Sequence, residues 1–241
     1  HLPRRDWQEK AESYIDPLTE ALKTPEGSMR LRMVQAAALT EIGLNQGLFA
    51  PIGVGHGKTL ISLLAPHLLD CERPLLLVPA QLRIATVSKY CRELSKHWQI
   101  PESFCDGSAV VSYGVLSTKN GKHILEERKP DLIICDEVHY LKAARAARTK
   151  RFLRYMKANP KTRFVGMSGT VTKKSIREYW HLNKLALPDG CPLPLRWPEM
   201  SDWANALDEN VRPEMRTEPG ALRFLCSDNE TPRAGYPRRL T

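Results

Sequence analysis

Five short apolar runs recur along the middle of the 241-residue chain, and longer stretches with helical spacing separate them. Continuously apolar runs of strand length are typical of parallel strands covered on both faces. We expect these strands at residues 48–52, 75–78, 109–112, 132–135 and 164–167. Apolar positions three and four residues apart predict helices, which fall at residues 4–22, 31–46, 58–69, 85–98, 143–156 and 174–187. Pro66 should end or kink the third helix. The alternation indicates an α/β fold, with a doubly wound, mainly parallel sheet and helices on both faces.

Proline and glycine divide the chain into three parts. Residues 1–28 are expected to form an N-terminal helical extension, with Pro25-Glu26-Gly27-Ser28 as its final break. Residues 29–187 hold the alternating strands and helices and form the main lobe. Prolines open residues 188–241, which we interpret as a linker or appendage with one short helix near residues 203–207.

Composition excludes several classes of protein. Hydrophobic residues make up 42% of the chain and charged residues 26%, as in ordinary globular proteins. No apolar run reaches membrane-spanning length and no basic-then-apolar leader is present, so we expect an intracellular protein with no membrane partner. Six cysteines without a C-x-x-C pair argue against zinc and against a disulfide scaffold. The first residue is histidine, which favours a processed chain or an excised fragment.

The charge balance favours a polyanionic partner. The chain has 36 lysines and arginines against 27 acidic residues, a net charge of +9. Basic surfaces release condensed counterions when they bind phosphate backbones, so this excess favours nucleic acid.

The strongest local pattern follows the first strand. Gly53, Gly55 and Gly57 alternate, and Lys58-Thr59 then begin an apolar helix. Glycines permit a turn whose backbone N–H groups converge on phosphate oxygens, and the helix dipole adds to that anion site. Lys58 is expected to neutralise the β- and γ-phosphates of ATP, and Thr59 to offer its hydroxyl to Mg²⁺.

Two further residues of this loop qualify the prediction. His56 is counted among the nucleotide-binding residues as a loop side chain and not as a catalyst. Ile52 stands where the strict G-x-x-x-x-G-K-[ST] pattern has glycine. The alternative interpretation is a glycine-rich turn followed by an incidental Lys-Thr pair.

Two carboxylates end the fourth apolar run, at Asp136 and Glu137. Ligands of α/β sheets bind at the carboxyl ends of strands, so these acids should lie on the same edge as the glycine-rich loop. Asp136 can hold Mg²⁺, and Glu137 can orient or deprotonate an attacking water. The alternative is a pair of solvated acids that cap a following helix.

Taken together, these segments resemble superfamily 2 helicases and translocases, in particular the Swi/Snf-like branch. The resemblance covers residues 29–187 and rests on the order of its motifs. Those motifs are Leu31-Arg32-Met33-Val34-Gln35, the glycine-rich loop, Val78-Pro79-Ala80, Ser112-Tyr113, Asp136-Glu137-Val138-His139 and Met167-Ser168-Gly169-Thr170. Val34 replaces an aromatic residue of the family pattern, and Val171 replaces its proline.

The resemblance implies a RecA-like P-loop NTPase lobe and assigns roles to individual residues. Gln35 would read the adenine of ATP. His139, Ser168 and Thr170 would couple the nucleotide state to nucleic acid. The expected nucleic-acid contacts are Pro79, Ala80, Gln81 and Lys142.

Basic residues follow the DEVH segment. They are Lys142, Arg145, Arg148, Lys150 and Arg151. They form either a solvated helix face or a set of phosphate contacts.

A motor of this family has a second RecA-like lobe that supplies arginine fingers, and we find no matching segment after Thr170. We therefore expect the first motor lobe of an ATP-dependent translocase, which binds ATP, Mg²⁺ and double-stranded DNA but hydrolyses ATP slowly without its second lobe. Two alternatives stay open. One is a strand-separating DExH helicase on DNA or RNA, and the other is a catalytically silent nucleotide- or nucleic-acid-binding module.

Overall fold

Five short strands form one parallel sheet in the computed structural model, which describes residues 7–170, 175–188, 190–208 and 211–225. The strands are β1 (Leu48–Pro51), β2 (Pro74–Val78), β3 (Val110–Ser112), β4 (Leu132–Asp136) and β5 (Arg163–Ser168). They lie in the order β1-β5-β4-β2-β3, and every neighbouring pair is parallel. The expected mixed α/β architecture is confirmed, and the ends of each expected strand move by at most one residue.

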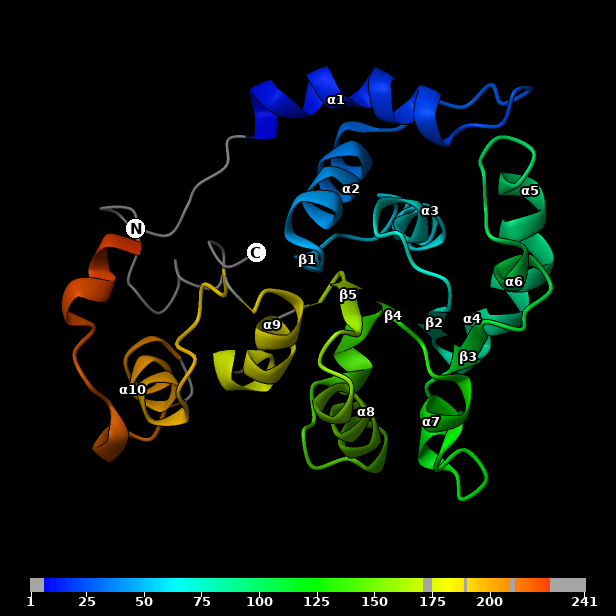
Figure 1. Ribbon diagram of the computed structural model, residues 1–241. Helices are drawn as coiled ribbons and strands as arrows, with labels where there is room; N and C mark the ends of the chain where they lie inside the picture. The colour runs from blue at the N-terminus through cyan, green and yellow to red at the C-terminus, as the bar shows by residue number, and fades with distance from the viewer. Residues whose placement is uncertain (1–6, 171–174, 189, 209–210, 226–241) are drawn as a thin grey trace.

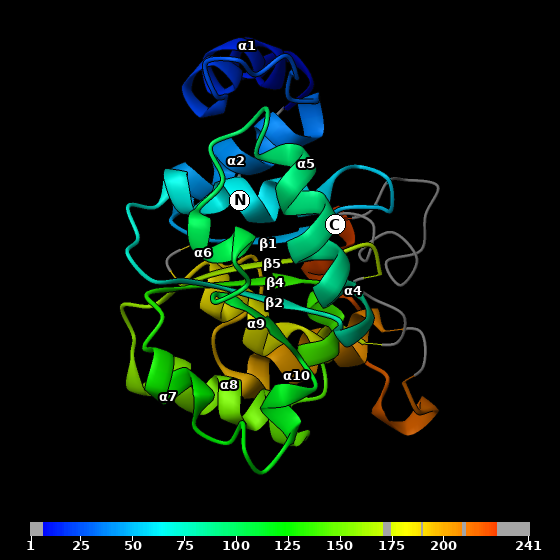
Figure 2. The ribbon, with the colours of Figure 1, turned by 90° about the vertical axis from the view of Figure 1, so that its right-hand side faces the viewer.

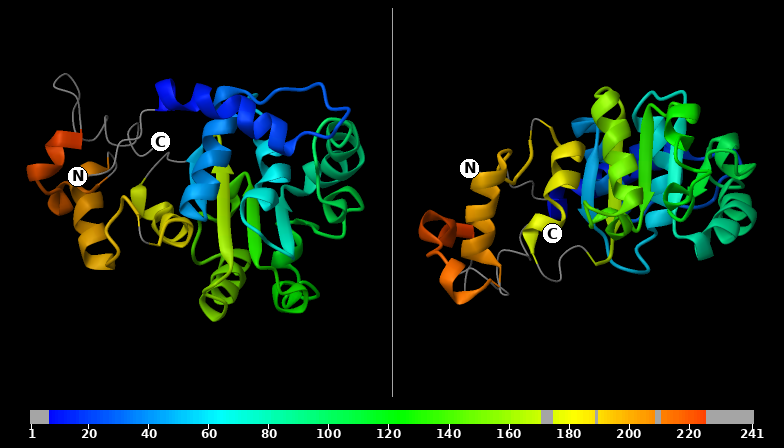
Figure 3. Two further views of the ribbon diagram at one scale, coloured as in Figure 1. Left: turned by 45° about the horizontal axis from the view of Figure 1, so that its top comes forward. Right: turned by 90° about the horizontal axis from the view of Figure 1, so that it is seen from below.

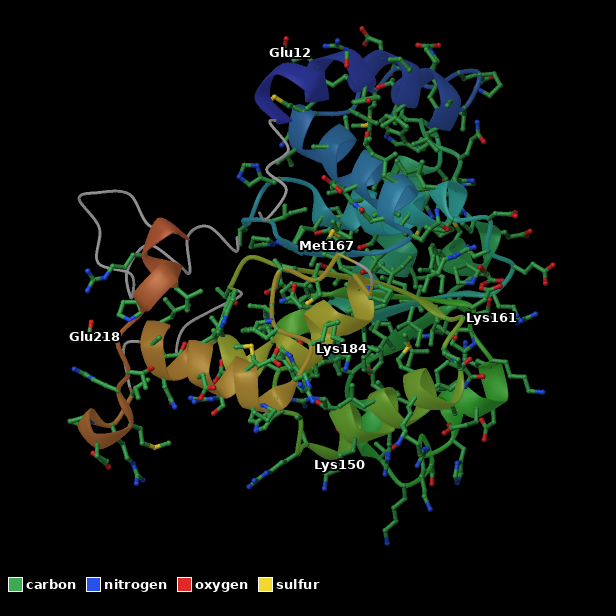
Figure 4. The ribbon with its side chains drawn as sticks, turned by 60° about the vertical axis from the view of Figure 1, so that its left-hand side comes forward. Glu12, Lys150, Lys161, Met167, Lys184 and Glu218 are labelled. Atoms are coloured by element: carbon green, nitrogen blue, oxygen red, sulfur yellow. The ribbon has the colours of Figure 1, made fainter. Side chains whose placement is uncertain are left out.

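The continuous apolar character of the central strands follows from burial on both faces. Along β4, Leu132 and Ile134 belong to one core cluster, whereas Ile133 and Cys135 belong to the other. Successive side chains of a strand point to opposite faces, so a strand between two helical layers needs apolar residues at every position. Met167 of β5 lies in this same sheet, between the helical layers (Figure 4).

Helices cover the two faces of the sheet as separate layers (Figures 1 and 2). The first layer consists of α2 (Met33–Asn45), α3 (Lys58–Leu64), α4 (Ala80–Ala85), the π-helix η2 (Thr86–Cys91), α5 (Arg92–Leu94) and α6 (Glu102–Cys105), with α1 (Trp7–Leu22) packed outside α2. The second layer consists of α7 (Ile124–Arg128), α8 (Ala147–Ala158) and α9 (Trp180–Ala186). Short 3-10 helices fill several connections: η1 (Ala65–Leu68), η3 (Val115–Ser117), η4 (Val138–Leu141) and η5 (Ile176–Glu178).

The direction of each crossover explains which layer it joins. The connections from β1 to β2 and from β2 to β3 step towards the β3 edge and run over the first face. The connections from β3 to β4 and from β4 to β5 step back and run over the second face. Crossovers between parallel strands share one hand, so reversing the direction of travel changes the face that is covered.

Helix boundaries differ from expectation more than strand boundaries do. The helix expected at 85–98 begins at Ala80, directly after Pro79, and passes through a π-helical turn. The helix expected at 143–156 begins at Ala147, because a 3-10 turn occupies the start of the connection. Within the segment expected at 174–187, α9 begins only at Trp180. As expected from Pro66, α3 ends at Leu64 and continues as the 3-10 helix η1.

The C-terminal part packs against the main lobe through a third core cluster (Figure 3). Its helix α10 (Trp197–Leu207) is longer than the short helix expected there, and η6 (Pro213–Met215) and η7 (Gly220–Leu225) follow. Asp208 accepts hydrogen bonds from the hydroxyl of Ser175 and, at 3.0 Å, from the backbone N–H of Ile176. Arg177 lies 3.7 Å from the same carboxylate. These contacts attach the appendage to η5. Within the described part of the chain, no helix combines the length and apolar character needed to cross a membrane.

Candidate functional site

The glycine-rich loop joins β1 to α3 at the carboxyl edge of the sheet. Gly55 and Gly57 have φ angles of 84° and 77°, which glycine adopts without the steric cost that a side chain brings. Lys58 begins α3, and its Nζ donates a hydrogen bond of 3.3 Å to the carbonyl of Gly53. Ile52, the departure from the strict pattern, is buried in the core beneath the loop. The Ile52 side chain therefore packs in the core, and the three glycines of the loop follow it.

The start of α2 holds the loop from the other side. Gln35 is buried, and its Nε2 donates a 3.4 Å hydrogen bond to the carbonyl of His56. Its Oε1 accepts a 2.9 Å bond from the backbone N–H of Arg32. The Arg32 guanidinium in turn donates to the carbonyl of Gly55 at 3.0 Å. A Cβ added to Gly57 would lie 2.2 Å from Gln35 Nε2, so the Gln35 side chain would have to move away from the loop; the φ of 77° is what favours glycine at this position.

These contacts change the interpretation of two residues. Gln35 contacts the loop and is not an exposed residue on a helix face; its adenine role stays a prediction. Arg32 was not among the predicted site residues, although it stands three positions before Gln35 in the motif that carries the resemblance. The His56 side chain is exposed at the loop tip, as expected of a loop residue.

Asp136 is the last residue of β4 and its side chain is only 6% exposed. Burial and the neighbouring Glu137 carboxylate raise the pKa of Asp136 to about 6, although Lys58 lowers it. No donor from the described residues reaches its buried Oδ1. An unbonded buried carboxylate oxygen is costly unless a cation or another donor satisfies it. Asp136 therefore fits the predicted role of a magnesium ligand.

Glu137 joins three predicted site residues into one cluster. Its Oε1 lies 3.4 Å from Lys58 Nζ, and its Oε2 lies 3.1 Å from His139 Nδ1. Ser168 Oγ donates to the same Oε2 at 3.0 Å and lies 2.9 Å from His139 Nδ1. The serine hydroxyl gives its one hydrogen to Glu137, so His139 Nδ1 must carry a proton to face both oxygens favourably.

The backbone directs Glu137 into this cluster. Its φ and ψ of 59° and 55° are left-handed, a conformation that non-glycine residues seldom adopt. At this turn the chain leaves the direction of β4, and η4 begins directly after Glu137. Backbone strain of this kind concentrates at functional sites, where the surrounding contacts maintain it.

The strand order places Ser168 between the loop and the acids. β5 pairs with β1 on one side, with Pro51 opposite Ser168, and with β4 on the other, with Asp136 opposite Met167. Ser168 is fully buried, and its Oγ also accepts the backbone N–H of Thr170 at 3.2 Å. Thr170 itself is exposed, so the structure brings Ser168 and His139 into the cluster but leaves the Thr170 side chain outside it. Val171 lies outside the described residues.

Thr59 is half-buried at the second position of α3. Its hydroxyl forms no hydrogen bond with another described residue, so it is free to serve as the second magnesium ligand that the sequence predicts. The described residues hold no group of three or more His, Cys, Asp or Glu side chains that could bind a metal ion by themselves. A magnesium ion here would depend on Asp136, Thr59 and the oxygens of a bound nucleotide.

The predicted nucleic-acid residues lie along the same edge but do not form one cluster. Pro79 is buried at the end of β2, whereas Ala80 and Gln81 are exposed in the first turn of α4. Lys142 lies 3.8 Å from Glu178. Of the other basic residues after the DEVH segment, Arg148 donates to the carbonyl of Tyr140, and Arg151 donates to the carbonyls of Leu116 and Thr118. Arg148 and Arg151 therefore hold separate backbone segments together, a role that neither the solvated-face nor the phosphate-contact alternative predicts.

Two tyrosines support the acidic turn from the second layer. Tyr113 is buried, and its hydroxyl donates to the carbonyl of Asp136 at 2.9 Å. Its ring stacks on Tyr140 with centroids 5.1 Å apart, and Arg148 lies over the outer face of Tyr140 at 5.6 Å. The Ser112-Tyr113 pattern is visible in the sequence, but the hydrogen bond from Tyr113 to the carbonyl of Asp136 is visible only in the structure.

Neither protein-family models nor curated proteins give a match to this chain.

Proposed function

We propose that this chain is the first, RecA-like motor lobe of an ATP-dependent DNA translocase or helicase of the Swi/Snf-like branch of superfamily 2. The proposal rests chiefly on one observation: Lys58, Glu137 and Ser168 come from three separate segments and meet at the carboxyl edge of a parallel sheet. That edge is where ligands bind in such sheets. The charges also match the requirements of phosphoryl transfer, with a cation in the loop and two acids opposite it.

Each residue then has a chemical role. Lys58 binds the β- and γ-phosphates from within the glycine-rich loop. Glu137 accepts the proton of the attacking water as its oxygen bonds to the γ-phosphorus and the bond to the β-phosphate oxygen breaks. Ser168 and His139 hold Glu137 Oε2 and so orient the carboxylate. Asp136 and Thr59 would hold Mg²⁺, which neutralises phosphate charge when bound.

Nucleotide binding requires the Lys58–Glu137 pair to separate. The two groups lie 3.4 Å apart and their side chains are 9% and 22% exposed. A triphosphate is the stronger partner for Lys58, and its arrival frees Glu137 Oε1 to face water. Arginines from a second lobe contribute roughly 10³–10⁵-fold in rate to related reactions, so this lobe hydrolyses ATP slowly by itself.

Binding of a fluorescent ATP analogue with Mg²⁺, followed by single-turnover hydrolysis, tests the proposal. Lys58→Ala should weaken binding roughly 100-fold, because a charge-assisted phosphate contact is lost. Glu137→Gln should retain binding and abolish the residual hydrolysis. The exposed Lys89 supplies a matched control, since Lys89→Ala removes an equal charge from η2 without touching the site. Hydrolysis that is the same in wild type and both site variants would instead indicate a catalytically silent module.

A second experiment distinguishes a DNA translocase from the strand-separating DExH helicase. In protein that contains both lobes, displacement of a triplex strand without unwinding of a tailed duplex supports the translocase. Unwinding of a tailed DNA or RNA duplex supports the strand-separating helicase.

A further inference from the structure

The excess positive charge of the chain is concentrated in one segment. Residues 111–161 contain twelve lysines and arginines against five acids, a net charge of +7, whereas the whole chain carries +9. Four of the five acids in this segment have partners or a place in the candidate site. Asp136 and Glu137 belong to the candidate site, Asp131 accepts two backbone N–H groups, and Glu126 pairs with Arg154. Glu127 is the acid of the segment left at its surface.

Two parts of the segment, the loop before α7 and helix α8, lie side by side on the second helical layer. Arg151 donates to the carbonyl of Thr118 at 2.6 Å, and Arg154 donates to the carbonyl of Lys122 at 2.9 Å. These bonds attach the loop between β3 and α7 to the side of α8. Both helices lie on the face of the sheet opposite α4, as Figures 1 and 2 show.

Eight cations of residues 111–161 are exposed and form no ion pair with a described residue. Five of them belong to α8 or to the segments directly before α7 and α8, and we call these five the α8 basic surface: Lys119, Lys122, Arg145, Lys150 and Lys157. Lys150 lies on the outer side of α8, away from the sheet (Figure 4). Lys157 follows it by two helical turns, about 10 Å along the axis, on the same side. The surface therefore extends along the helix and is not a single point charge.

The surface contains cations without apolar anchors. Among the described residues, the large hydrophobic side chains with high exposure lie elsewhere, as at Ile84 and Trp197. Single-stranded nucleic acids bind on aromatic side chains that stack with bases, and protein interfaces centre on buried aromatic or aliphatic anchors. Membrane surfaces also take an apolar face of the protein. A duplex backbone needs cations alone, because its phosphates lie outside and its bases are stacked within.

We propose that the α8 basic surface binds the phosphate backbone of double-stranded nucleic acid. This contact lies on the opposite face of the sheet from the α4 residues Ala80 and Gln81, so it is separate from the contacts that the resemblance implies. It rests on the proposed function only for the choice of nucleic acid as the polyanion. Binding here requires neither nucleotide nor the cluster around Glu137.

Anisotropy of a labelled 20-base-pair duplex, without nucleotide and over a series of salt concentrations, tests this inference. The variant carries Lys119→Gln, Lys150→Gln and Lys157→Gln. Each phosphate neutralised contributes ~0.9 to the slope of log K against log salt. We expect the variant to lower that slope by about 2 to 3, with roughly tenfold or greater loss of affinity.

A second triple variant controls for net charge. Lys23→Gln, Arg30→Gln and Arg196→Gln also remove three charges, each at an exposed ion pair outside the α8 basic surface. The control should keep the wild-type slope. Equal loss in both variants, or binding of the wild type to anionic vesicles but not to duplex, overturns the inference. Loss confined to the first variant supports it even where Lys58→Ala leaves ATP binding unchanged, a result that would reject the proposed function alone.

Discussion

Ser168 donates a 3.0 Å hydrogen bond to the carboxylate of Glu137, which is 31 residues away in the sequence. The bond holds Glu137, which we propose as the general base, at the end of β5, the strand between β1 and β4. A hydrogen bond to a charged group contributes about 1.5–3 kcal/mol. Glu137 is therefore oriented by a fully buried residue rather than by solvent.

Replacing Ser168 with alanine tests this orientation. We expect hydrolysis to fall roughly tenfold or more while affinity for the ATP analogue stays within about twofold, because the bond orients the base and not the phosphates. Single-turnover hydrolysis and analogue titration measure the two effects. Ser62→Ala is the matched control: Ser62 is equally buried on α3, and its hydroxyl has no partner among the described residues. A parallel fall in both variants would contradict the orienting role.

Three glycine-to-alanine variants should form an ordered series. Gly57→Ala combines a positive φ with a Cβ 2.2 Å from Gln35 Nε2, so it should reduce analogue binding most. Gly55→Ala meets no atom within 4 Å and brings only the left-handed penalty of about 1–2 kcal/mol. Gly169→Ala has neither problem, since its nearest contacts are 3.5 Å away. Analogue affinity and Tm measure the series, and a different order would argue against this loop geometry.

The contact between Gly57 and Gln35 predicts coupling between the two positions. Truncating Gln35 to alanine removes the atom that an alanine side chain at position 57 would meet. The loss of Tm in Gly57→Ala/Gln35→Ala should then be smaller than the sum of the two single losses. Additive losses of Tm in this double-mutant cycle would show that overlap with Gln35 does not destabilise the Gly57→Ala variant.

The raised pKa of Asp136 predicts a pH-dependent cost in stability. The pKa is about 6 in the folded chain against a usual 3.8. The folded chain therefore loses up to roughly 3 kcal/mol of its free energy of unfolding as the pH rises through this range and Asp136 ionises. Without magnesium, Asp136→Asn should have a higher Tm than wild type at pH 8, and the difference should shrink towards pH 4.

The same substitution should abolish magnesium-dependent nucleotide binding, and in wild type this binding should weaken as pH falls below about 6. Asp202→Asn, at an exposed position of α10, should change neither property. Thermal unfolding at several pH values and analogue titration with and without Mg²⁺ provide the measurements. An Asp136→Asn variant less stable than wild type at pH 8 would contradict the burial argument.

Asp208 should control the attachment of the C-terminal appendage. Asp208→Ala removes the acceptor of the Ile176 N–H and the carboxylate beside Arg177, which should cost about 2–4 kcal/mol. Limited proteolysis should then cleave near residues 188–196 sooner, with Asp202→Ala as the control. An unchanged cleavage rate would mean that the third core cluster alone maintains the attachment.

The sequence predicted the strands because burial on both faces requires an unbroken apolar run, as in Leu132-Ile133-Ile134-Cys135. Helix starts were harder to predict, since short 3-10 turns such as Val138–Leu141 lack a helical period of their own. The residue types of the site were also evident, because glycines before Lys58 and acids after β4 are local patterns.

Strand order was not predictable from local patterns. Which strand lies between β1 and β4 depends on tertiary packing, and so therefore does the meeting of Ser168 with Glu137. The same reason explains Arg32 and Gln35, whose contacts with Gly55 and His56 join segments more than twenty residues apart. The tail arginines at 233, 238 and 239, where no second-lobe motif was found, lie outside the described residues.

The position of β5 also limits how this lobe can move. Hydrogen bonds to β1 on one side and to β4 on the other prevent β5 from sliding without breaking both ladders. The end of β5 thus behaves as a rigid reference point for the loop and the acids alike. Any movement during the proposed motor cycle must then arise by rotation of whole layers or outside the sheet, and a spectroscopic probe placed on β5 should report no displacement relative to its two neighbours.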